Sequence, residues 1–142
     1  MAFIELSDYK TQLRERFLME LIQSDLNLIN QAEKEAIQTV TDYLLPQYDT
    51  DVIFAATGDD RNFHLLRHVK NIVLYIIYQR LPANQIPEII TENYSATLEY
   101  MTAIRDGDTD MNLPRKTDEN DKSIIRFKWG SATKRSISED YL

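Results

Sequence analysis

Apolar residues recur three and four positions apart along long stretches of the chain, and this spacing constrains the fold more than any other feature. It places the apolar side chains on one face of an α-helix. The chain also has only three glycines, each at a point where the pattern breaks, whereas tight β-turns depend heavily on glycine. The sequence therefore predicts a mainly α protein, a small bundle of about four helices.

The first half of the chain carries signals for two of these helices. The pair Ser7-Asp8 supplies good N-cap residues for a first helix, and residues 17–22 either finish that helix or form a buried connector. A second helix ends before Pro46, because proline disfavours helical backbone in the residue before it. Its apolar stripe consists of Leu28, Ile29, Ala32, Ala36, Val40, Tyr43 and Leu44.

Two further helices follow a predicted loop at residues 46–61, which is rich in Asp and Thr. The third, at about 62–81, has apolar residues on most sides, so we expect it to lie at the centre of the bundle. The fourth runs from about 87 to 105, with proline in its first turn and Gly107 as its C-terminal cap.

The helical period stops after Gly107, which divides the chain into a helical body at 1–107 and an arm at 108–142. Asp, Thr, Asn, Lys and Pro dominate residues 108–123, as in a linker. Residues 123–129 then alternate between apolar and basic side chains, which predicts a short strand, and 134–142 are a possible second one. Because a two-stranded ribbon is marginal alone in water, we expect the arm to lie on another surface.

Composition narrows the class of protein. A chain of 142 residues is about one domain long, and it has no uninterrupted apolar run long enough to span a membrane. Its first residues lack the basic start and apolar run of a secretory signal. Without cysteine there is no disulfide, thiolate nucleophile or cysteine-ligated metal, which is consistent with a reducing compartment.

Charge is unevenly distributed along the chain. The net charge is −7, which opposes non-specific DNA binding, yet residues 122–135 contain five basic and no acidic side chains. Phe127 and Trp129 are interleaved with these cations, a pattern that resembles a platform for single-stranded nucleic acid. We favour a protein partner for this stretch and keep a small helical nucleic-acid-binding or regulatory protein as the alternative.

Candidate metal and catalytic residues are incomplete. His64 and His68 lie four apart on one helix face, but the zincin motif needs glutamate directly after the first histidine, and the sequence places no third ligand. A run of alternate aspartates lacks the glycine and glutamate of a calcium-binding EF-hand loop; it consists of Asp106, Asp108 and Asp110. No nucleophile elbow, phosphate loop or dinucleotide fingerprint is present. We therefore expect neither an enzyme nor a bound cofactor or metal.

The order of these motifs resembles the head–tail connector proteins of tailed bacteriophages, also called neck adaptors or head-completion proteins, with the Mu-like branch the most similar. In the second helix Tyr43, Leu44 and Tyr48 match the family in register, whereas Thr41 replaces an aspartate. The apolar third helix with Tyr75 also resembles its counterpart. The fourth helix matches at Tyr94, Leu98, Ile104 and Gly107, whereas Thr97 and Met101 replace the family's alanine and leucine.

This resemblance implies a non-enzymatic virion protein of the phage neck, made in the cytoplasm of the bacterial host. Such subunits form a ring of about twelve copies beneath the portal, where they extend the DNA channel toward the tail. The implied partners are copies of the chain itself, the portal protein and a downstream neck or tail-completion protein. Phage DNA would pass without sequence-specific binding, and no membrane is involved.

The arm holds the residues that we expect to bind these partners. Aromatic side chains are favoured at interface hot spots, so Ile125, Phe127 and Trp129 are the expected apolar anchors, with Tyr141 near the end of the arm. The basic residues are expected to contact acidic surfaces or neighbouring subunits; they are Arg126, Lys128, Lys134 and Arg135.

Overall fold

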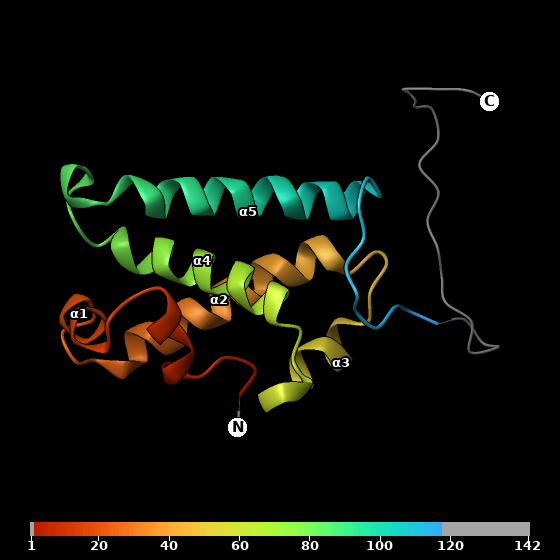
Figure 1. Ribbon diagram of the computed structural model, residues 1–142, viewed down its shortest axis with the longest axis horizontal. Coiled ribbons are helices and arrows are strands. Elements are labelled where there is room, and N and C mark those ends of the chain that lie inside the picture. Colours follow the sequence, from red (N-terminus) through yellow and green to blue (C-terminus); the bar gives the residue numbers. More distant parts are fainter. Residues whose placement is uncertain (1, 118–142) are drawn as a thin grey trace.

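The computed structural model describes residues 2–117 and shows a mainly helical fold, as the spacing of apolar residues predicts. Three long helices, α2, α4 and α5, pack together, with α4 in contact with both of the others (Figure 1). The shorter α1 and α3 lie at opposite ends of this bundle. The helices in chain order are η1 (Leu6–Thr11), α1 (Glu15–Leu21), α2 (Leu26–Leu44), α3 (Thr50–Ala55), η2 (Gly58–Asp60), α4 (Phe63–Tyr78), η3 (Ala83–Gln85) and α5 (Glu88–Asp106).

Helix α4 is the centre of the bundle, as its apolar girth predicts. It contacts both α2 and α5, and its buried residues occupy successive turns on more than one face. The core also takes in Leu18 of α1, Val40 of α2 and Met101 of α5, which are all buried. No helix in the described part of the chain is both long and apolar enough to cross a lipid bilayer.

The helix ends follow the predicted capping chemistry in several places. Helix α2 ends at Leu44, before Pro46. Helix α5 begins at Glu88, directly after Pro87, and ends at Asp106, with Gly107 as its C-cap, whose φ of 83° is left-handed. Glycine adopts this conformation without the steric penalty that a side chain brings. The N–H of Asp108 donates to the Ala103 carbonyl oxygen at 2.9 Å, which completes a Schellman-type cap.

The N-terminal part of the chain differs from the prediction. Ser7 and Asp8 lie inside a 3₁₀-helix whose N-cap is Glu5, and α1 is a separate helix. The Asp8 carboxylate accepts the Glu5 N–H at 2.7 Å and also forms an ion pair with Arg61 at 2.6 Å. A contact to a residue far along the chain therefore fixes this segment, and local spacing does not reveal such a contact.

The predicted loop at residues 46–61 contains the short helix α3. Its N-cap is Asp49, whose side chain accepts the Val52 N–H at 3.3 Å. Ile53 is buried, whereas Val52 is half exposed. Periodicity cannot distinguish so short an apolar run from a strand or loop, which is why the sequence did not predict this helix.

Candidate functional site

The segment after Gly107 turns back across one end of the bundle and is held there by backbone hydrogen bonds. An isolated antiparallel bridge pairs Arg115 with Tyr48. The Asp49 N–H donates to the Pro114 carbonyl oxygen at 2.9 Å, and the Lys116 N–H donates to the Gln47 carbonyl oxygen at 3.1 Å. We call residues 108–117, with the residues of the α2–α3 connection that hold them, the C-terminal anchor (Figure 1).

Tyr48 is the aromatic centre of this anchor. Only 1% of the residue is exposed, and its hydroxyl oxygen accepts the Met111 N–H at 3.1 Å. The guanidinium carbon of Arg115 lies 4.9 Å from the centroid of the Tyr48 ring, within the range of a cation–π contact. Tyr48 therefore satisfies a backbone donor of the segment and also supports a cation that belongs to it.

Gln47 links the anchor to the end of α5. It is buried, and its Nε2 donates to the carbonyl oxygens of Ile104 and Arg105 at 3.3 and 3.4 Å. The last carbonyls of a helix lack the usual helical partners; the Ile104 oxygen also accepts the Gly107 N–H at 3.2 Å, and Gln47 adds a donor to both carbonyls. Its Oε1 accepts from Arg115 Nη1 at 3.3 Å, and Arg115 Nη2 also pairs with Asp110 at 2.9 Å.

The start of the predicted linker thus belongs structurally to the body. Met111 is 7% exposed and joins the main core, and Leu113 packs against that core. The Asn112 carbonyl oxygen accepts from Asn62 Nδ2 at 3.0 Å. The predicted change at Gly107 coincides with the end of α5, but the chain stays on the body as far as the described residues continue.

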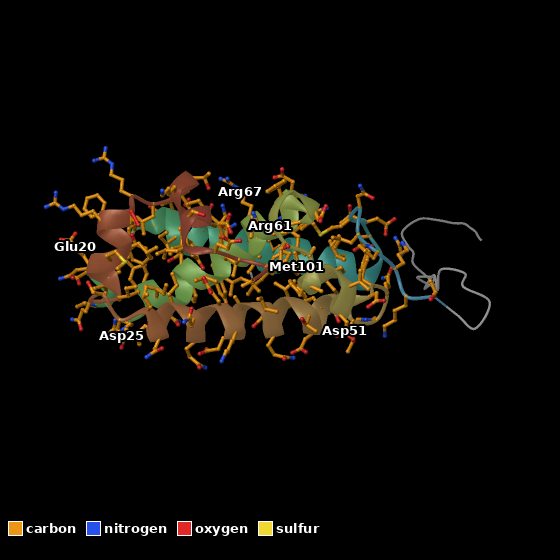
Figure 2. All side chains as sticks on the ribbon, turned by 90° about the horizontal axis from the view of Figure 1, so that it is seen from below. Glu20, Asp25, Asp51, Arg61, Arg67 and Met101 are labelled. Carbon is orange, nitrogen blue, oxygen red and sulfur yellow. The ribbon has the colours of Figure 1, made fainter. Side chains whose placement is uncertain are left out.

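The residues that carry the phage resemblance fall into two groups. Leu44, Met101 and Ile104 are fully buried, and Tyr43 lies under the guanidinium of Arg105, 5.2 Å from its ring centroid. Tyr48 belongs to the anchor, and Gly107 directly precedes it. Figure 2 shows Met101 inside the bundle.

A second group lies between α4 and α5. The rings of Tyr75 and Tyr94 stack with centroids 3.8 Å apart and an angle of 5° between their planes. Burial raises the pKa of Tyr94, and the nearby Tyr75 and Tyr43 raise it further. Leu98, on the same helix as Tyr94, is partly buried. These tyrosines therefore pack α4 and α5 together.

The two histidines do converge on one face of α4. Their Nε2 atoms lie 3.2 Å apart, and His68 Nδ1 lies 2.9 Å from the Thr97 hydroxyl oxygen. Burial lowers the pKa of His68 to about 4, and the charges of His64 and Arg67 add to this effect. Among residues 2–117 no group of three or more His, Cys, Asp or Glu side chains is arranged to hold a metal ion.

The arm residues expected to bind partners lie outside the described residues, and the short strand expected at residues 123–129 lies there as well. They are Ile125, Arg126, Phe127, Lys128, Trp129, Lys134, Arg135 and Tyr141. The sequence did not single out Gln47 or Arg115. Both are polar, and nothing local distinguishes a buried glutamine or a paired arginine from a solvated one.

Comparison with known proteins identifies the family. Residues 3–127 match the family described as Bacteriophage Mu, Gp36, a match that covers the helical body, the whole C-terminal anchor and the first part of the arm. The searches of curated proteins and of solved structures found no match. The expected relation to a Mu-like phage family is confirmed, whereas the connector role stays a prediction. The chain therefore belongs to the bacteriophage Mu Gp36 family.

Proposed function

We propose that this phage protein is a structural subunit of the head–tail connector, without enzymatic activity, which assembles as a ring beneath the portal and joins the capsid to the tail. The single observation that carries the proposal is the family match over residues 3–127. It makes the chain a phage protein, and the anchored helical body supplies the physical reason for a role in assembly.

This physical reason concerns how the arm can bind a neighbouring subunit. A ring of identical subunits closes when each subunit grips the next through two different surfaces. An arm serves as one such surface if its root is fixed to the body, and Tyr48 and Arg115 fix the chain shortly before residue 118. Fixing the root also lowers the conformational entropy that the arm loses on binding.

The proposed contacts beyond the anchor follow the chemistry of the arm. Phe127 and Trp129 would supply apolar anchors, with Ile125 beside them, and the five cations of residues 122–135 would face acidic surfaces. The rest of the chain is acidic, with 15 acidic and 9 basic side chains in residues 1–105. An acidic channel wall would repel passing DNA and keep it from adhering.

The test is the copy number of the protein in purified virions, measured by quantitative mass spectrometry, for the wild type, a deletion of residues 118–142 and Trp129→Ala. Ser131→Ala is the matched control in the same stretch. We expect about twelve wild-type copies per particle, loss of the protein after the deletion and at least a fivefold decrease for Trp129→Ala.

Absence of the wild-type protein from virions would overturn the connector proposal. Tight binding of the purified protein to nucleic acid, with affinity that falls steeply as salt increases, would then support the alternative of a small nucleic-acid-binding regulator. Circular dichroism of each variant shows whether the helical body is intact.

A further inference from the structure

An open apolar groove lies at the end of the bundle opposite the C-terminal anchor. Its volume is ≈ 540 Å³, within the range of sites that hold small ligands or a few side chains. The groove lies between α1 and the C-terminal end of α4. Figure 2 labels Glu20 at this end and Asp51, of α3, toward the other. Its apolar lining consists of Leu13, Phe17, Leu21, Tyr78 and Leu81.

Phe17 shows that this groove lacks a cover within the described residues. Half of the residue, 50%, is exposed, although it is the largest apolar side chain that α1 carries. Leu13, Leu21 and Leu81 are only partly buried. Covering Phe17 would gain free energy from apolar burial.

The charge around the groove differs from that of the rest of the body. Arg80 and Glu20 both lie in its lining, and the exposed Arg14, at the N-cap of α1, and Arg16 precede Phe17. Three arginines therefore outnumber the two glutamates of α1, Glu15 and Glu20. None of the three arginines forms an ion pair with a residue in the described part of the chain. Arg80 Nη1 donates only to a backbone oxygen, that of Leu21, at 3.0 Å. The groove therefore favours an apolar segment that also carries carboxylates.

The last seven residues of the chain have this composition. Residues 136–142 read Ser-Ile-Ser-Glu-Asp-Tyr-Leu, with two acidic side chains, no basic one and three large apolar side chains. The preceding stretch at 122–135 carries five basic side chains and no acidic one, so the arginines around the groove would repel it. Charge complementarity therefore selects the terminal segment over the basic part of the arm.

The chain is also long enough for this segment to reach the groove. The anchor holds the chain up to Thr117, and the twenty residues from 118 to 137 can span about 66–72 Å when extended. A 19-residue helix such as α2 is about 28 Å long. The segment can thus cross the bundle of its own molecule or reach that of an adjacent copy.

We propose that residues 137–142 dock in this groove, with Tyr141 and Ile137 against Phe17 and with Glu139 and Asp140 facing Arg14, Arg16 and Arg80. The docked segment covers the exposed ring and gives the arginines carboxylate partners. This proposal goes beyond the connector role and does not depend on it, because docking is a property of the purified full-length chain.

The absence of cysteine from the chain permits a direct test by disulfide formation. Gln23→Cys places a thiol in the groove lining, and Ser138→Cys places one in the segment. The control pair combines Ser138→Cys with Gln38→Cys, an exposed position in the half of α2 that leads to the anchor. We expect the first pair to oxidise at least tenfold faster than the control, and Phe17→Ser to remove that difference.

A crosslink within one chain or between two copies supports the proposal equally, since the segment occupies the groove in both cases. Equal rates for the two pairs, no crosslink at Gln23→Cys, or a rate that Phe17→Ser leaves unchanged would overturn it. Circular dichroism of Phe17→Ser checks the fold. The result is independent of virion assembly, so a failure here is distinguishable from a failure of the connector proposal.

Discussion

The guanidinium carbon of Arg115 lies 4.9 Å from the centroid of the buried Tyr48 ring, and the same guanidinium pairs with Asp110 and Gln47. The Arg115 side chain therefore links the C-terminal segment to the α2–α3 connection. Because Gln47 also binds the last carbonyls of α5, Arg115 is linked through Gln47 to the end of that helix.

Removing this side chain should release the segment and leave the helices intact. We expect Arg115→Ala to lower the free energy of unfolding by about 1–2 kcal/mol, the size of one cation–π contact plus a partly exposed ion pair. Hydrogen exchange at the amides of Met111 and Lys116 should become faster. Lys116→Ala is the matched control, because Lys116 binds the body through its backbone N–H. Equal exchange in the two variants would contradict the role of Arg115.

The long helices were predictable from sequence because their apolar residues repeat with the helical period. The stripes of α2 and α4, the proline before α5 and the Gly107 cap all depend on residues close together in the chain. The stacked Tyr75 and Tyr94 pack α4 and α5 together, and both of these helices were predictable from the spacing of their apolar residues.

Contacts between distant residues were not predictable in this way. Asp8 is drawn into a 3₁₀-helix that depends on Arg61, and Lys70 reaches the Asp8 carbonyl oxygen and the Thr11 hydroxyl at 2.9 and 2.8 Å. The anchor likewise depends on a contact between Gln47 and Arg115, which lie far apart in the sequence. The arm residues, which the sequence analysis favoured for binding, lie outside the described residues, so their role remains a prediction.

The ion pair between Asp8 and Arg61 should make stability depend on pH in the acidic range. Burial alone would raise the pKa of Asp8, but hydrogen bonds from Arg61 and the Glu5 N–H and the charges of Arg61 and Lys70 lower it below its usual value. The folded state then binds this proton less readily than the unfolded chain does. The stabilisation is complete above the ordinary carboxyl pKa of about 3.9 and is lost as pH falls through the lower, folded value.

Asp8→Asn should therefore cost about 1.5–3 kcal/mol near neutral pH, as expected for hydrogen bonds to charged groups, and the difference from wild type should shrink below about pH 4. Urea denaturation across this range measures it. Asp42→Asn, on the exposed face of α2, is the control and should cost little at any pH. A constant difference between wild type and Asp8→Asn would argue against the ion pair.

His68 should add a separate pH dependence at higher pH. Its pKa falls to about 4 in the folded protein, mainly through burial, whereas an unfolded histidine titrates near about 6.5. Protonation therefore favours the unfolded chain, and stability should decrease as pH falls from about 6.5 to about 4. His68→Gln should flatten this part of the curve. His64→Gln should retain most of it, because burial of His68 is unchanged. Identical curves for wild type and His68→Gln would refute this assignment.

A glycine substitution in the turn after α1 should stabilise the protein. Gln23 and Ser24 have φ values of 54° and 61°, in the left-handed region where a side chain costs about 1–2 kcal/mol. The Ser24 N–H donates to the Met19 carbonyl oxygen at 2.9 Å, and the Gln23 N–H donates to that of Glu20 at 3.2 Å, which is the Schellman pattern that favours glycine at the position of Gln23.

We expect Gln23→Gly to raise the free energy of unfolding by about 0.5–1 kcal/mol, because relief of the left-handed strain exceeds the entropic cost of glycine. Gln31→Gly, at an exposed position inside α2, should lower it by about 1 kcal/mol, because glycine has poor helix propensity and the variant loses the hydrogen bond from Gln31 Nε2 to Glu35 Oε2 at 3.3 Å. Thermal and urea denaturation of the two variants give opposite signs if the φ of Gln23 is the cause. A loss of stability in both would mean that the Gln23 side chain contributes more to the fold than its backbone strain costs.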